Sequence, residues 1–310
     1  SVFIPPASGF NADIRVQGDK SISHRAIIIG SLAKGVTKIS NFLEAADTLD
    51  TAKIYRQMGV SISKKGRDYY VKGRGLFSLK KPSSFLYVGN SGTSIRLNLG
   101  VLAAQDFDSE ITGDKQIVKR PMRRVLDPLS LMGASFESNG GFAPIKVKGA
   151  ALKGIDYTMP VASAQVKSAI LLAGLHASSK TVIREKEKSR DHTERMLRYF
   201  GAGISVKGRV ITLTPGRELK AAPVLVPADI SSAAYFLAAA AMIEDSEVVV
   251  RDVGVNPTRT GLIEVMKRMG ANVKLTNRCV KNGEPVADIR AKTSGLKGVV
   301  IGGAVIPKLR

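Results

Sequence analysis

The tripeptide Met269-Gly270-Ala271 has three close counterparts earlier in the chain: Met58-Gly59-Val60, Met132-Gly133-Ala134 and Phe200-Gly201-Ala202. In each of them an apolar residue that closes a helical stretch is followed by glycine, the typical stop of a helix. The four glycines recur at nearly equal intervals of about 70 residues, and a fixed period indicates a repeated structural unit. The sequence therefore predicts four copies of one supersecondary unit.

Each copy carries the same order of patterns. In the first, an apolar helix over 25–33 precedes a strand at 37–39, and a polar helix ending near Gly59 precedes paired strands at 60–62 and 69–71. The apolar helices, expected at 25–33, 95–104, 166–176 and 232–243, are apolar almost all round and so should be buried. In the second copy, Pro128 should kink or shorten the polar helix.

The predicted unit is therefore βαβαββ, and the fold class is α/β. A linear solenoid would also produce the period, but buried helices favour units that close around a shared helical core.

Composition narrows the class of protein. A chain of 310 residues is long enough for two domains, and 44% hydrophobic residues indicate a globular protein. No apolar run reaches the length of a membrane span, and the N-terminus does not resemble a signal peptide. The single cysteine fits a reducing, cytoplasmic location. His24, His176 and His192 are scattered, so we expect neither a metal site nor a cofactor.

The formal charge of +21 is unusual for a metabolic enzyme. It suggests a polyanionic partner, either nucleic acid or small phosphorylated molecules, although a solvated basic surface explains many of the lysines equally well. Aromatic residues make up only 5% of the chain and do not alternate with basic ones. This composition argues against binding single-stranded nucleic acid by base stacking.

A polar cluster precedes the expected buried helix in every copy. Helix N-termini offer free N–H groups and a positive dipole end, which favour phosphate and carboxylate. The alternative for any one cluster is an ordinary N-cap. Because the clusters recur, and because Lys20, Arg25 and Arg96 accompany them, we favour a convergent anion site. The clusters span residues 18–25, 89–96, 163–168 and 229–232.

Two further basic segments, 119–124 and 189–195, place arginines near expected helix starts. The guanidinium fork suits a pair of carboxylate or phosphate oxygens. The simpler alternative is that the arginines of the second segment pair locally with Asp191 and Glu194.

Six of these motifs together resemble the 5-enolpyruvylshikimate-3-phosphate (EPSP) synthase family, the shikimate-pathway enzymes inhibited by glyphosate. The motifs are Gly-Asp-Lys-Ser-Ile-Ser-His-Arg (18–25), Gly-Asn-Ser-Gly-Thr-Ser-Ile-Arg-Leu (89–97), Lys-Arg-Pro-Met (119–122), Ser-Ala-Gln-Val-Lys-Ser (163–168), Ser-Arg-Asp-His-Thr-Glu (189–194) and Asp-Ile-Ser-Ser-Ala-Ala (229–234). His24 and the fifth motif resemble the glyphosate-tolerant bacterial class. The resemblance covers essentially the whole chain.

The resemblance implies transfer of the enolpyruvyl group of phosphoenolpyruvate to the 5-hydroxyl of shikimate 3-phosphate, with no cofactor. It places Lys20 between the two substrates and gives Lys20 and Gln165 catalytic roles. Contacts to phosphoenolpyruvate are implied for Lys20, Gly92, Arg120 and Gln165. Where many relatives have a second serine this chain has Ala164, so that phosphate contact is expected from the backbone. The residues implied for shikimate 3-phosphate are Lys20, Ser21, Arg25, Ser163, Ala164, Gln165 and Arg190.

The family has six repeats in two inside-out α/β barrel domains, whereas four are found here. We therefore expect a complete domain over residues 14–226, and a partial second domain from residues 1–13 and 227–310. The family's proposed base at the 5-hydroxyl would lie beyond Arg310. We expect this chain alone to be a monomer that binds shikimate 3-phosphate and turns over poorly or not at all, unless a separate C-terminal fragment completes it. An incomplete domain should also expose apolar surface.

Two other functions remain open. The related transferase acting on UDP-N-acetylglucosamine is expected to have Lys-Asn near its start, whereas here Ser21 follows Lys20. The chain could also be a non-catalytic basic remnant that retains only anion affinity. We expect no nucleic-acid or membrane partner.

Overall fold

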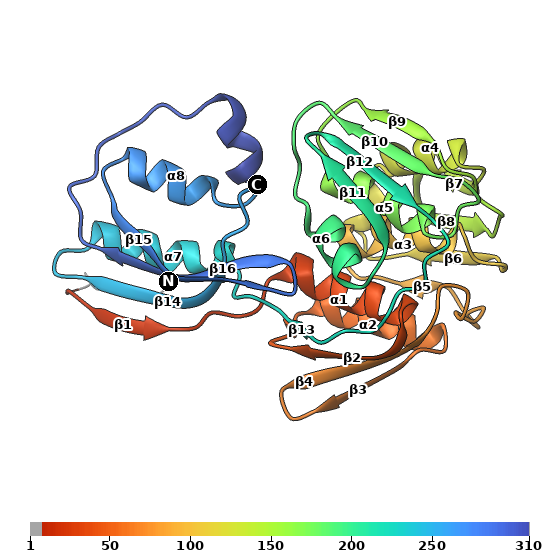
Figure 1. Ribbon diagram of the computed structural model, residues 1–310, viewed down its shortest axis with the longest axis horizontal. Coiled ribbons are helices and arrows are strands. Elements are labelled where there is room, and N and C mark those ends of the chain that lie inside the picture. Colours follow the sequence, from red (N-terminus) through yellow and green to blue (C-terminus); the bar gives the residue numbers. More distant parts are fainter. Residues whose placement is uncertain (1–7, 310) are drawn as a thin grey trace. The chain divides into compact units, whose positions relative to one another are not determined.

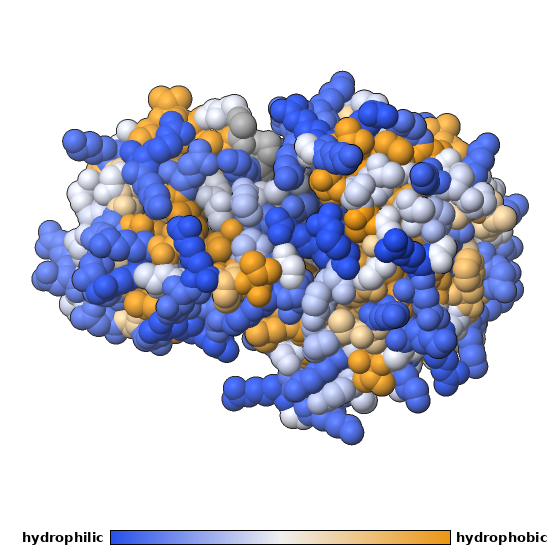
Figure 2. All heavy atoms as spheres, in the orientation of Figure 1, coloured by the Kyte–Doolittle hydropathy of each residue, from blue (hydrophilic) through white to orange (hydrophobic). Residues whose placement is uncertain are grey.

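The computed structural model describes residues 8–309, which form four four-stranded sheets and their helices. The chain divides into two compact units, one from Lys20 to Leu225 and the other from residues 8–19 and 226–309. The first unit contains three of the sheets and the second contains one (Figure 1). Hydrophilic residues cover much of the visible face of each unit, and smaller apolar patches interrupt them (Figure 2).

Two of the repeats in the first unit are continuous in sequence. In each, the first strand pairs parallel with the second, and the last strand pairs antiparallel with the second. The third strand completes the sheet by pairing antiparallel with the last. The first of these repeats comprises β5 (Leu86–Tyr87), α3 (Gly92–Leu102), β6 (Ser109–Thr112), the 3₁₀ turn Ile117–Lys119, α4 (Arg123–Leu131), β7 (Ser135–Asn139) and β8 (Phe142–Lys148). The next comprises β9 (Asp156–Met159), α5 (Ala164–Gly174), β10 (Thr181–Glu185), α6 (His192–Tyr199), β11 (Gly203–Lys207) and β12 (Val210–Thr214).

The other two repeats take their first strand from a distant part of the chain. In the first unit, the short strand β13 (Val224–Leu225) pairs parallel with β2 (Lys34–Ser40) in the sheet of the N-terminal repeat. That repeat otherwise comprises α1 (Lys20–Leu32), β2 (Lys34–Ser40), α2 (Ala46–Gln57), β3 (Ser61–Lys65) and β4 (Asp68–Arg74). In these two copies, the first strand of the βαβαββ unit is therefore not adjacent in sequence to the rest of the repeat.

In the second unit, β1 (Asn11–Ile14) supplies the missing first strand by pairing parallel to β14. The repeat continues through α7 (Ile230–Met242), β14 (Glu247–Gly254), α8 (Gly261–Arg268), β15 (Asn272–Lys281) and β16 (Glu284–Lys292), followed by the 3₁₀ segment Gly303–Leu309. Helices α7 and α8 lie on one side of this sheet (Figure 1). The expectation that this unit is incomplete stays a prediction.

The repeating glycines end helices as predicted. Gly59, Gly133, Gly201 and Gly270 all have φ between 83° and 104°, a range that strongly favours glycine. At Gly59 the glycine N–H donates to the Arg56 carbonyl and the next N–H donates to the Tyr55 carbonyl, both at 3.0 Å. The same pair of bonds follows the other three helices. This is the Schellman arrangement, which satisfies carbonyls left free at a helix end.

Helices α1, α3 and α5 are buried along nearly their whole length and pack in the core of the first unit. This confirms the expected helical core and excludes a linear solenoid for this unit. Pro128 lies inside α4, which has 9 residues, whereas the corresponding helix α2 has 12 and α6 and α8 have 8 each; the expected kink or shortening stays a prediction.

The prediction of a fully buried helix was wrong for α7. Tyr235 is 80% exposed and Met242 is 67% exposed, whereas Ala233, Leu237 and Ala240 on the opposite face are buried. Within the described part of its unit, α7 packs mainly against β14 and β16. Apolar composition predicted burial on all sides, but a helix buries only the faces that other elements cover. None of the helices in residues 8–309 is long and apolar enough to cross a bilayer.

The close approach of α3 and α5 depends on Gly100. A Cβ built at this position would lie 2.1 Å from the backbone carbonyl oxygen of Ala169. Because a backbone oxygen inside a helix cannot move aside, we expect Gly100→Ala to lower the free energy of unfolding by about 3 kcal/mol. Urea unfolding measures this effect. Gly295→Ala is the control, because a Cβ there meets no atom within 4 Å; equal midpoints for the two variants would contradict the prediction.

Candidate functional site

The polar clusters lie within the first turns of the buried helices. Lys20 and Ser21 begin α1, Gly92 begins α3, and Ala164 and Gln165 begin α5. These helices begin two to five residues earlier than predicted, because a polar first turn carries no apolar periodicity. The clusters therefore lie at the helix N-termini, where N–H groups lack helical partners and the positive end of the helix dipole is found.

Several cluster residues are also N-caps. The Ser91 hydroxyl accepts a hydrogen bond from the Ser94 N–H (3.1 Å), and the Ser163 hydroxyl accepts one from the Val166 N–H at 3.4 Å. In the second unit, the Asp229 carboxylate accepts one from the Ser231 N–H at 3.2 Å. The capping alternative is therefore correct for these three residues. Other cluster members, among them Arg25, Arg96 and Gln165, reach across to neighbouring helices.

Arg25 joins three helices. Its side chain is buried, with the residue 4% exposed. Nε donates to the Thr193 hydroxyl of α6 (2.7 Å), Nη2 to the Ser168 hydroxyl of α5 (2.9 Å), and Nη1 to the Ser21 carbonyl (2.9 Å). The two hydroxyls are themselves 2.6 Å apart. These bonds fix the plane of the guanidinium group between α1, α5 and α6.

Gln165 joins the second and third repeats. Its Oε1 accepts a hydrogen bond from Arg96 Nη1 (3.0 Å), and its Nε2 donates to the Thr93 hydroxyl at 3.1 Å. Both partners lie on α3. The bonds bring the starts of α3 and α5 together, so residues from two clusters face one another.

Arginines gather beside Gln165. Burial lowers the pKa of Arg96 below its ordinary value, and the positive charges of Arg124 and Arg120 lower that pKa further. Arg120 Nη2 donates to the Asn90 side-chain oxygen at 2.9 Å. Among residues 8–309, no carboxylate forms an ion pair with Arg96 or Arg120. Like charges held together in this way favour the binding of an anion.

Gly92 provides space in front of these arginines. A Cβ at position 92 would lie 2.8 Å from Arg96 Nη1 and 3.0 Å from Arg120 Nη1. A side chain at position 92 would therefore crowd the ends of these two arginines.

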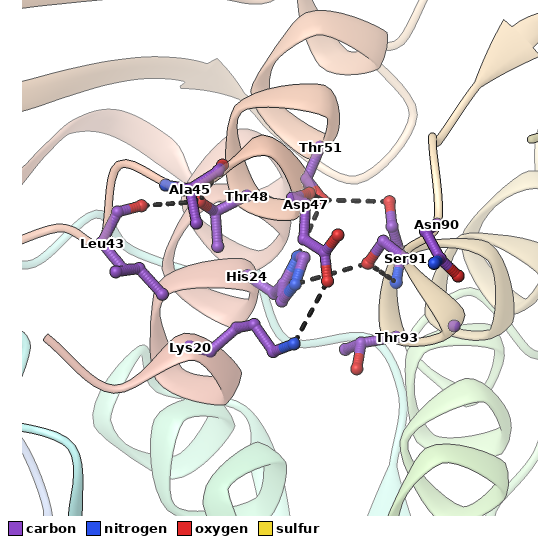
Figure 3. Close-up of polar contacts among 12 residues, drawn as sticks. Lys20, His24, Leu43, Ala45, Asp47, Thr48, Thr51, Asn90, Ser91 and Thr93 are labelled. Atoms are coloured by element: carbon purple, nitrogen blue, oxygen red, sulfur yellow. Dashed lines mark hydrogen bonds and ion pairs between the residues drawn. The ribbon is translucent and has the colours of Figure 1, made fainter. Parts of the chain in front are cut away.

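Lys20 pairs with an acid that the sequence analysis did not single out. Its ammonium lies 3.2 Å from Asp47 Oδ2, and its side chain is 53% exposed. Figure 3 shows Lys20 and His24 on α1, with Asp47 and Thr51 on α2 and with Ser91 and Thr93 at the start of α3. His24 is buried, with Nδ1 2.8 Å from the Thr51 hydroxyl and Nε2 3.4 Å from the Ser91 hydroxyl. These contacts connect the first cluster to the second.

Arg190 lies half-buried in the loop between β10 and α6. The expected local pairing is confirmed for Asp191, whose Oδ1 lies 2.8 Å from Arg195 Nε. It was wrong for Glu194, whose carboxylate pairs instead with Lys167 of α5 at 2.7 Å. A tertiary contact has replaced the local one.

Sequence reasoning gave no role to four residues that hold the site together, namely Asp47, Asn90, Thr93 and Thr193. The last three lie within the quoted motifs, but a motif does not show which distant residues its members contact. Asp47 is in the first turn of α2, where an acidic residue is ordinarily explained by the helix dipole. The described residues contain no group of three or more His, Cys, Asp or Glu side chains that could hold a metal ion.

Comparisons with known proteins agree with one another. A family model described as EPSP synthase (3-phosphoshikimate 1-carboxyvinyltransferase) matches residues 5–306. The chain is 50% identical over 304 residues to the 3-phosphoshikimate 1-carboxyvinyltransferase of Bacillus velezensis, covering 97% of this chain and 71% of that protein. It is 54% identical over 297 residues to the enzyme of the same name from a Thermoanaerobacter species, covering 96% and 70%.

A solved structure is equally similar. EPSP synthase from Acinetobacter baumannii superposes with a TM-score of 0.91 and 48% identity, covering 98% of this chain and 69% of that one. The fold of this chain therefore has a counterpart of known structure.

Proposed function

The chain belongs to the EPSP synthase family, and from this premise we propose that it transfers the enolpyruvyl group of phosphoenolpyruvate to the 5-hydroxyl of shikimate 3-phosphate. In this reaction the vinyl carbon bearing the phosphate becomes bonded to the 5-oxygen, and inorganic phosphate leaves. The observation that carries the proposal is the convergence of three basic helix starts, where Arg96 and Arg120 lack acidic partners among the described residues. Two substrates that both carry phosphate and carboxylate suit such a site.

Roles follow from the family motifs, one position at a time. We assign Ser21, Arg25, Ser163, Gln165 and Arg190 to shikimate 3-phosphate, with the backbone of Ala164. Gly92 and Arg120 are assigned to phosphoenolpyruvate, with Lys20 between the substrates and Gln165 reaching both. Gln165 supports this assignment because its side chain bonds to Arg96. It also lies on α5, whose Ser168 hydroxyl bonds to Arg25.

We also propose residues 14–226 as the domain that binds shikimate 3-phosphate, with residues 1–13 and 227–310 belonging to the second domain. The compact grouping of residues 20–225 supports this division. The proposed enzyme uses no cofactor, acts in the cytoplasm as a monomer, and has no nucleic-acid or membrane partner.

Ligand-dependent melting tests the function. Shikimate 3-phosphate at millimolar levels or below should raise the melting temperature, because a ligand that binds only the folded state stabilises it. UDP-N-acetylglucosamine and DNA should have no such effect. A steeply salt-dependent affinity for DNA with no response to shikimate 3-phosphate would identify a basic binding protein instead.

Turnover is measured separately, as phosphate release that requires both substrates. That residues 1–310 by themselves bind shikimate 3-phosphate with little or no turnover stays a prediction. Steady-state phosphate release by the purified chain would contradict it, and restored release on adding a C-terminal fragment of a relative would support complementation.

Gly92→Ala tests the site for phosphoenolpyruvate. The added methyl group would push the ends of Arg96 and Arg120 apart, and we expect the affinity for phosphoenolpyruvate to fall about ten-fold. Because only flexible side-chain ends must move, stability should change by less than about 0.5 kcal/mol. Calorimetry in the presence of shikimate 3-phosphate measures the affinity. Gly298→Ala, where a Cβ meets no atom within 4 Å, should change neither quantity, and equal affinities for the two variants would refute the assignment.

A further inference from the structure

Lys167 is a fully buried lysine two residues beyond Gln165. Its side chain is 0% exposed, and its ammonium lies 3.1 Å from Glu185 Oε2 and 2.7 Å from Glu194 Oε1. A charge without solvent is costly, and apolar side chains of similar volume commonly support a fold as well as a buried ion pair does. Stability alone therefore does not account for this cluster of one lysine and two glutamates.

The cluster ties down the loop that carries Arg190. Glu185 stands at the end of β10, and its Oε1 accepts a hydrogen bond from the Ser189 N–H (3.0 Å) and another from the Ser189 hydroxyl. The Lys167 ammonium also donates to the Ser189 carbonyl at 3.4 Å. The chain is thus held by three bonds at the residue immediately before Arg190.

The same cluster ties α6 to α5. Glu194 of α6 follows Thr193, and Lys167 of α5 precedes Ser168. The ion pair between Lys167 and Glu194 therefore lies directly beside the pair of hydroxyls that hold Arg25. The Lys167–Glu194 ion pair thus forms one buried layer of contacts between α5 and α6. The Ser168 and Thr193 hydroxyls form the adjacent layer, which binds Arg25. Sliding α6 along α5 would disrupt both layers together.

We propose that Lys167, with Glu185 and Glu194, is a positioning cluster that sets the placement of Arg25 and of the Arg190 loop for binding shikimate 3-phosphate. The proposal rests on the proposed function, since it concerns the same substrate. These three residues do not touch the substrate; they act through Thr193, Ser168 and Ser189.

A charge-free variant separates positioning from stability. In Lys167→Met/Glu185→Gln/Glu194→Gln, no buried charge is left unpaired, and the amide oxygen introduced at position 185 can still accept from Ser189. We expect a melting temperature within about 3 °C of the parent. The dissociation constant for shikimate 3-phosphate, measured by calorimetry, should rise about ten-fold, and the phosphorus NMR resonance of the bound substrate should shift or broaden.

Leu213→Ala is the matched control. Leu213 is buried on β12 of the same sheet, so its truncation loosens the core without touching the cluster. It should leave both the dissociation constant and the phosphorus resonance unchanged. If the charge-free variant does not fold, Glu194→Gln provides the test, because it keeps the Lys167–Glu185 pair and weakens only the connection between α5 and α6; a rise of about three-fold is then expected.

The outcomes are distinct. A folded charge-free variant with the parent's dissociation constant and resonance overturns the positioning role, as does an equal loss of affinity in Leu213→Ala. Failure of the parent chain to bind shikimate 3-phosphate overturns the proposed function itself.

Discussion

Replacing Lys167 alone with methionine is expected to lower the free energy of unfolding by about 3–5 kcal/mol at neutral pH. The substitution removes the positive charge that lies within 3.1 Å of both Glu185 and Glu194, and both carboxylates are then buried without a counter-charge. Breaking a buried pair costs more than replacing the whole pair, because the remaining charge cannot be solvated. Urea unfolding at pH 7 measures the loss.

The loss should depend on pH in a definite direction. Burial already raises the pKa of Glu194 above its ordinary value of 4.5, against the opposing effect of Lys167, and removing Lys167 raises that pKa further. A group whose pKa is higher in the folded state binds protons on folding. Its contribution to stability is therefore fully present below the ordinary value and is lost as the pH rises through the folded-state pKa. The loss of unfolding free energy caused by Lys167→Met should therefore become smaller as the pH is lowered from 7 towards 5.

Lys207→Met is the control for this experiment, since Lys207 is an exposed lysine on β11 of the same sheet. Its stability should stay within about 0.5 kcal/mol of the parent at either pH. If Lys167→Met loses the same unfolding free energy at pH 7 and pH 5, or loses more at pH 5, unpaired carboxylates are not the cause of the loss.

Replacing Arg25 with methionine is expected to weaken binding of shikimate 3-phosphate about 100-fold, equivalent to about 2.7 kcal/mol. A hydrogen bond to a charged group contributes about 1.5–3 kcal/mol, and the guanidinium group is held in one orientation by three bonds. The fold should persist, because Ser168 and Thr193 remain bonded to each other at 2.6 Å. Calorimetry gives the affinity and circular dichroism checks the fold.

Arg25→Lys distinguishes charge from geometry. Lysine keeps the positive charge but lacks the planar fork that reaches Thr193 and Ser168 together. We expect an affinity between those of the parent and of Arg25→Met. A folded Arg25→Met protein that binds with the parent's affinity would remove Arg25 from the site, and equal affinities for Arg25→Lys and the parent would show that charge alone matters.

Local patterns predicted the repeat well. Each glycine at a helix end adopts the positive φ that the pattern demanded, because a Schellman turn involves only residues close in sequence. The strands predicted at 60–62 and 69–71 pair with Ile62 opposite Val71 for the same reason. Helix starts were less well predicted, since the polar first turns of α1, α3 and α5 lack the apolar spacing that marks a helix.

The exposed face of α7 shows the limit of composition. Its residues are as apolar as those of α5, yet Tyr235 and Met242 remain largely exposed. Burial depends on which elements cover a helix, and that information lies outside the helix.

The sequence by itself determined the repeated α/β pattern, the helix-ending glycines and the basic and polar residue types at the helix starts. These features depend on interactions within a few residues or on residue type. Only the tertiary structure decided that Gln165 faces Arg96, that Arg25 bonds to Thr193 and that Glu194 turns to Lys167 instead of a neighbouring arginine. The partners in the first two of these contacts are 69 and 168 residues apart. Such distances close only when α1, α3, α5 and α6 pack together, and a one-dimensional pattern carries no record of that packing.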